Sequence, residues 1–132
     1  MGTFAFVVAV LLAIGFAWMR SRRSPLARAI GARPILDADA IRAERADRYT
    51  LDPRTTRDVL RALGAALEVD AGRLRLDDPL DLLWDMSPHA GFHQRATFET
   101  WLVAHYPKLP DGFAPATVGE LVAGLQKIPL RS

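Results

Sequence analysis

Residues 117–128 have the sequence TVGELVAGLQKI, and this stretch indicates the fold class more clearly than any other part of the chain. Apolar residues recur in it every three or four positions, which predicts one apolar stripe along a helix: Val118, Leu121, Val122, Leu125 and Ile128. Thr117 and Glu120 form a capping box, in which each side chain accepts a hydrogen bond from the other residue's backbone. Pro129 ends the helix. Such a helix needs neighbours to cover its stripe.

Two more amphipathic helices precede it. Residues 92–106 place Phe98, Leu102 and Tyr106 on one face, and Pro107 stops the pattern. Residues 53–68 begin well, because an N-cap aspartate is followed by proline at the first helical position. Their apolar stripe contains Val59, Leu60, Leu63, Ala66 and Leu67. Three such helices and no strand pattern predict that residues 51–132 form an all-α domain, a small helical bundle.

A long ordered loop is expected over residues 69–91. This segment contains Pro79, Pro88, two glycines and five aspartates, which are typical of turns and loops. Its leucines are expected to tuck beneath the loop as satellite core residues: Leu74, Leu76, Leu80, Leu82 and Leu83.

The N-terminal segment is apolar and carries no charge between Gly2 and Met19. Eighteen helical residues rise about 27 Å, slightly less than a hydrocarbon core of about 30 Å, and Trp18 with the following arginines can cover the difference. A cleaved signal peptide would need a basic segment before the apolar run and small residues after it, and both flanks differ from this. The sequence therefore predicts a single transmembrane helix over residues 1–19 that contacts the lipid bilayer through residues 2–19.

Charge is distributed unevenly along the chain. Residues 20–33 contain five arginines and no acid, whereas residues 34–132 contain 12 basic and 15 acidic residues. Basic residues next to a membrane span favour the cytoplasmic side. The expected arrangement is therefore a single-pass protein of the inner (cytoplasmic) membrane, with a basic juxtamembrane linker over 20–50 and a cytoplasmic domain over 51–132. One short basic patch does not indicate a nucleic-acid partner.

The order of features in the C-terminal domain resembles an acyl carrier protein: a helix, a long loop, a helix, a short third element, and a last helix that opens with Thr-Val-Gly-acid. The residues that carry the resemblance are 66–70 (ALEVD), 76–82 (LDDPLDL), 98–102 (FETWL), 109–111 (LPD) and 117–122 (TVGELV). The resemblance implies a four-helix bundle that carries an acyl or aminoacyl chain on 4′-phosphopantetheine, with acyl-chain enzymes as possible protein partners.

This chain departs from the family at the attachment position. Carriers of this type have Asp-Ser-Leu at the start of the second helix, where the serine oxygen bears the prosthetic group. The matching stretch here is WDMSP, 84–88, and Ser87 lies one residue after the expected place. Two interpretations of Ser87 remain open at this point: a phosphopantetheine attachment site, or a helix N-cap or loop residue before Pro88.

A second departure concerns charge. Carrier proteins present an acidic second helix to basic patches on their enzymes, but residues 92–105 contain one acid, Glu99, beside Arg95 and two histidines. The acids lie in the preceding loop instead, where they either meet a partner or solvate and cap the loop: Asp77, Asp78, Asp81 and Asp85.

No other chemistry is indicated by the sequence. The chain contains no cysteine, and His89 and His93 with Asp85 do not make a zinc-binding pattern. No nucleophile elbow is present, so we expect neither catalytic residues, nor a metal, nor an enzyme. The preferred hypothesis is a membrane-anchored acyl-carrier-like protein without a prosthetic group that acts as an interaction module. The alternative is an active carrier bearing 4′-phosphopantetheine on Ser87.

Overall fold

The structure is a computed structural model that describes residues 2–21, 25–87 and 91–129, and within the first of these ranges the side chains of residues 3–14. Its helices follow one another in the order α1 (Gly2–Ser21), α2 (Pro25–Ile30), α3 (Ala38–Glu44), α4 (Pro53–Leu67), the 3₁₀-helix η1 (Ala71–Arg73), α5 (Leu80–Asp85), α6 (Phe92–His105) and α7 (Val118–Leu125). Strands are absent from these ranges, and the predicted helical bundle is confirmed.

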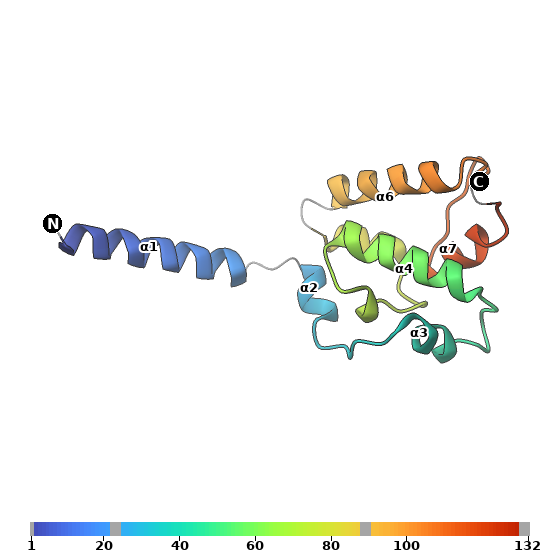
Figure 1. Cartoon of the computed structure of the whole chain (residues 1–132), viewed down its shortest axis with the longest axis horizontal. Coiled ribbons are helices and arrows are strands. Elements are labelled where there is room, and N and C mark those ends of the chain that lie inside the picture. Colours follow the sequence, from blue (N-terminus) through green and yellow to red (C-terminus); the bar gives the residue numbers. More distant parts are fainter. Residues whose placement is uncertain (1, 22–24, 88–90, 130–132) are drawn as a thin grey trace.

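Helix α4 is the centre of the bundle. It contacts α3, η1, α6 and α7 (Figure 1). Its start is the predicted one: the Asp52 carboxylate accepts a hydrogen bond from the Thr55 backbone N–H at 2.9 Å, and Pro53 occupies the first helical position. The predicted stripe is buried along its whole length, and Val59 and Leu63 are completely inaccessible to solvent.

The last helix, α7, is capped slightly differently from the expectation. The Thr117 hydroxyl accepts a hydrogen bond from the Glu120 N–H at 3.2 Å, as predicted. The Glu120 carboxylate, however, accepts a hydrogen bond from the Ala116 N–H at 2.8 Å, one residue before the expected donor. The buried face of α7 comprises Val118, Leu121, Val122 and Leu125, but the helix ends at Leu125, so Ile128 of the predicted stripe lies beyond it and is only partly buried.

The loop predicted over 69–91 contains regular structure that the sequence analysis did not anticipate. Helix α5 lies within it, preceded by the short η1. Four of the five leucines expected to tuck beneath the loop are buried, but Leu82 points outward and is 50 % exposed. The segment is fastened to the start of α7 by backbone hydrogen bonds, such as the Leu80 N–H to the Ala116 carbonyl at 2.9 Å and the Gly119 N–H to the Leu76 carbonyl at 2.8 Å.

Residues 25–49, which belong to the expected juxtamembrane linker over 20–50, pack against the bundle. Leu26, Ile30 and Ile41 are almost completely buried and belong to the same core as α4 and α7. The Leu26 N–H donates to the Met86 carbonyl at 2.9 Å, and the Leu36 N–H donates to the Gly72 carbonyl at 2.9 Å. The core therefore draws on side chains from both sides of residue 50.

Helix α1 differs from its prediction. It projects away from the bundle in Figure 1, and the side chains of residues 3–14 are exposed. Among the helices in the described ranges, none has both the length and the apolar character required to cross a membrane. The prediction of a single transmembrane helix over residues 1–19 is therefore corrected: α1 is helical, but over the described residues it does not meet that requirement.

Candidate functional site: Ser87 and an apolar groove

Ser87 follows Met86, the C-cap of α5, at the C-terminal end of that helix. Its side chain is buried, and its hydroxyl donates a hydrogen bond to the Leu83 carbonyl, one turn earlier, at 2.8 Å. Its backbone N–H donates to the Trp84 carbonyl at 3.0 Å. The serine is thus held at a helix C-terminus, where the partial charge is negative and does not attract an anionic group.

The next long helix begins several residues later. Helix α6 starts at Phe92, and Gly91 is its N-cap with a positive φ of 73°. The Gly91 backbone lies close to Trp84, because a Cβ atom on this glycine would come within 2.5 Å of the Trp84 carbonyl oxygen. The suggested role of Ser87 as an N-cap before Pro88 depends on residues 88–90, which lie outside the described residues, as does His89.

A prosthetic group on Ser87 would need a hydroxyl that a transferase can reach. The Ser87 residue is only 4 % exposed, and its O–H is already used within the chain. The residues present do not fit a phosphopantetheine attachment site in this conformation.

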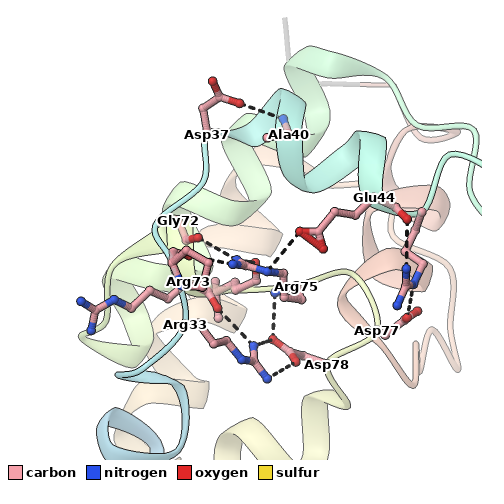
Figure 2. Close-up of polar contacts among 12 residues, drawn as sticks. Arg33, Asp37, Ala40, Glu44, Gly72, Arg73, Arg75, Asp77 and Asp78 are labelled. Atoms are coloured by element: carbon pink, nitrogen blue, oxygen red, sulfur yellow. Dashed lines mark hydrogen bonds and ion pairs between the residues drawn. The ribbon is translucent and has the colours of Figure 1, made fainter.

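Two of the four loop acids have partners inside the domain. Asp78 is buried and accepts two hydrogen bonds from the Arg33 guanidinium, at 2.7 and 2.9 Å, and a third from the Arg75 backbone N–H at 2.8 Å (Figure 2). Asp77 accepts hydrogen bonds from Arg45 and Arg48. The hydrogen bond from Arg45 is the main cause that lowers the pKa of the Asp77 carboxyl below its ordinary value. These two acids therefore hold residues 33–48 against the loop.

Arg75 also holds residues 33–48 against the loop. Its guanidinium donates to the carbonyl of Pro34 and to that of Gly72, both at 2.7 Å, and lies 3.5 Å from the Glu44 carboxylate (Figure 2). We call this cluster the clamp, and it comprises Arg33, Glu44, Arg45, Arg75, Asp77 and Asp78. Its role is structural, because its polar groups are directed at one another.

The other two loop acids have no ionic partner in the described part of the chain. Asp81 and Asp85 lie exposed on α5, and no ion pair to either occurs in the described residues. Asp81 also lines a hollow in the protein surface.

This hollow is an apolar groove of about 480 Å³, within the size range of sites that bind ligands. It lies between α5, α6, the 109–116 segment and the start of α7, and we call it the α5–α6 groove. Its lining residues are Leu80, Asp81, Trp84, Arg95, Phe98, Glu99, Leu102, Val103, Leu109, Phe113, Ala114, Pro115, Ala116 and Leu121. The only charged members of this set are Asp81, Arg95 and Glu99.

Comparison with family models, with curated proteins and with solved structures finds no match. The resemblance to acyl carrier proteins therefore depends on the residues quoted above.

The aromatic residues of α6 divide between the core and the surface. Phe98 is buried, with its ring centroid 5.8 Å from that of Trp84 and 5.7 Å from that of Trp101. Tyr106 is also buried, and burial raises the pKa of its hydroxyl above the ordinary value. Phe92, in contrast, is 83 % exposed at the start of the helix.

Sequence reasoning assigned some of the groove residues to helices and missed the groove. Phe98, Leu102 and Leu121 were assigned to stripes that helices bury against one another, but the 109–116 segment does not close the space between those helices. The sequence contains one signal of the groove, which is Val103. This apolar residue lies beside the predicted stripe of α6 and is not needed for the core of the bundle. Within the described ranges, no three histidine or acidic side chains come together in a way that could hold a metal ion.

Proposed function

We propose that this chain is an acyl-carrier-like protein that works as a non-catalytic interaction module and carries no prosthetic group. The observation that supports the proposal most directly is the Ser87 hydroxyl, which is buried and donates to the Leu83 carbonyl. Modification would first require this hydrogen bond to break and the end of α5 to open. The α5–α6 groove, in contrast, is open to a partner without any rearrangement.

The backbone next to Ser87 opposes such an opening. The N–H groups of Met86 and Ser87 donate to the carbonyls of Leu82 and Trp84, both at 3.0 Å. The Met86 carbonyl in turn accepts the hydrogen bond from the Leu26 N–H, which ties this turn to α2. A serine that lies one residue later in a helix points in a direction rotated by about 100° around the helix axis. Such a misplacement of the hydroxyl can lower the rate of phosphopantetheine transfer by orders of magnitude.

The test is the mass of the protein after co-expression with a promiscuous phosphopantetheinyl transferase. We expect the full chain to keep its unmodified mass, while an ordinary acyl carrier protein in the same cells is converted. The matched variant is Met86→Ser, which restores Asp-Ser at 85–86 and places a hydroxyl on a half-buried residue instead of a buried one. A gain of one phosphopantetheine by the natural chain, lost in Ser87→Ala, would show that the active carrier is the correct interpretation.

A further inference from the structure

We propose that the α5–α6 groove binds one amphipathic helix of a partner protein, and that this helix has basic residues beside its apolar stripe. This inference deepens the interaction-module function and depends on it for its biological meaning. Its physical basis is the shape, the apolar surface and the charge of the groove.

The floor of the groove consists of buried side chains, whereas apolar side chains at its edges are partly exposed. Trp84, Phe98 and Leu121 are at least nine-tenths buried and form the floor. Phe113 is half-buried and Val103 is 68 % exposed, so apolar side chains remain accessible at the edges. Apolar surface that is left uncovered by the described residues favours association with another apolar surface.

The dimensions suit a helix. The α6 side of the groove runs from Arg95 to Val103, a rise of about 12 Å, which corresponds to more than two helical turns. A helix that lies along this edge would bring apolar residues at positions i, i+3 or i+4, and i+7 over the floor, which is the usual way in which grooves bind amphipathic helices.

The charged residues at the groove determine which charge on a partner helix is favoured. Arg95 on α6 is paired with Glu99 at 3.2 Å, so its charge is already balanced. Asp81 on α5 makes no ion pair in the described residues, and Asp85, exposed one turn later, lies outside the groove lining and makes none either. The groove therefore presents unbalanced negative charge along its α5 side, which attracts a basic helix and repels an acidic one.

The experiment uses the full chain and two synthetic peptides. Each peptide is an amphipathic helix of about four turns with the same leucine stripe; the polar face carries lysine in one and glutamate in the other. Fluorescence anisotropy of the labelled peptides measures binding. We expect the Leu/Lys peptide to bind at least tenfold more tightly than the Leu/Glu peptide, and the difference to decrease with salt.

Two variants locate the site. Val103→Arg places a cation at the groove edge and should weaken binding of the Leu/Lys peptide at least tenfold. Ile35→Arg adds the same charge at an exposed residue before α3 that does not line the groove, and should leave binding unchanged. Both residues are at least half exposed, so neither variant should unfold the protein.

Several results would overturn the proposal. Equal binding of the two peptides would reject the charge preference. Equal weakening by both variants, or by neither, would place the peptide elsewhere. Failure of both peptides, together with binding of a fluorescent fatty acid that Val103→Arg abolishes, would assign the groove to a small apolar ligand; failure of all three probes would reject a binding groove. Mass spectrometry of Ser87 is independent: a modified chain that still binds the Leu/Lys peptide would overturn the proposed function alone.

Discussion

At the scale of single residues, Asp78 links the N-terminal part of the domain to the loop before α5. It is buried and receives two hydrogen bonds from Arg33 and one from the Arg75 backbone. Removing one member of such a pair leaves the other without its partner in a poorly hydrated place, which costs more than the net contribution of the bond.

We therefore expect Arg33→Ala to lower the free energy of unfolding by about 1–3 kcal/mol. The guanidinium is one-third exposed, which keeps the loss below that of a fully buried ion pair. Urea denaturation provides the measurement. Arg28→Ala removes an exposed arginine of α2 and should change the stability by less than about 0.5 kcal/mol. Equal urea midpoints for the two variants would contradict the role assigned to the clamp.

Asp52 and Asp77 predict how stability responds to acid. A backbone hydrogen bond from Thr55 lowers the pKa of Asp52, and the hydrogen bond from Arg45 lowers that of Asp77. Both carboxyls therefore release their protons more readily in the folded than in the unfolded chain. Their contribution to stability is present above the unfolded pKa of about 3.9 and is lost as the pH falls through the lower folded values.

The expected result is a urea midpoint that falls as the pH decreases below about 4, and falls less steeply in the double variant Asp52→Asn/Asp77→Asn. The variant should be less stable than the natural chain at neutral pH and approach it in acid. Parallel pH profiles of the two proteins would show that these carboxyls do not contribute in the way described.

At the scale of elements, the predictable part of the fold is the part with a helical period. Helices α4, α6 and α7 were predicted from their apolar stripes and from the caps at Asp52 and Thr117. Helix α5 has only six residues and follows Pro79, so it is too short to show a period. Leu26 and Ile30 lie on one face of α2, but that helix has only six residues, and Ile41 is the single buried residue of α3, so neither helix shows a repeated apolar pattern.

Helix α3 illustrates the last point, because Ile41 is its one buried side chain. Ile41 is 1 % exposed and packs in the common core. Ile41→Ala should cost about 2–5 kcal/mol, since it removes buried methyl groups and leaves a cavity. Ile35→Ala is the matched control, because Ile35 is 58 % exposed and should lose far less. Thermal unfolding followed by circular dichroism compares the two, and similar melting temperatures would argue against a docked α3.

At the scale of the whole molecule, the groove and the boundary of the folding unit depend on how elements pack. The α5–α6 groove exists because α5, α6 and the 109–116 segment leave space between them. The apolar pattern of a single helix does not predict such a space. The boundary is similar: composition places it near residue 50, where the basic, alanine-rich segment ends, but the core continues to Leu26. Hydrogen bonds from Arg33 to Asp78 and from Leu26 to Met86 cross that boundary.

The folding unit is therefore expected to be residues 25–132 and not 51–132. Removing residues 25–50 exposes the pockets of Leu26, Ile30 and Ile41 and leaves Asp78 without Arg33. Each of the three apolar side chains contributes about 1.5–3 kcal/mol when buried, and together they approach the total stability of a small domain, about 5–15 kcal/mol. Chain 25–132 should melt cooperatively and give a dispersed amide NMR spectrum, whereas 51–132 should be partly unfolded at 25 °C. If 51–132 is as stable as 25–132, the N-terminal helices α2 and α3 lie on the bundle without supporting it.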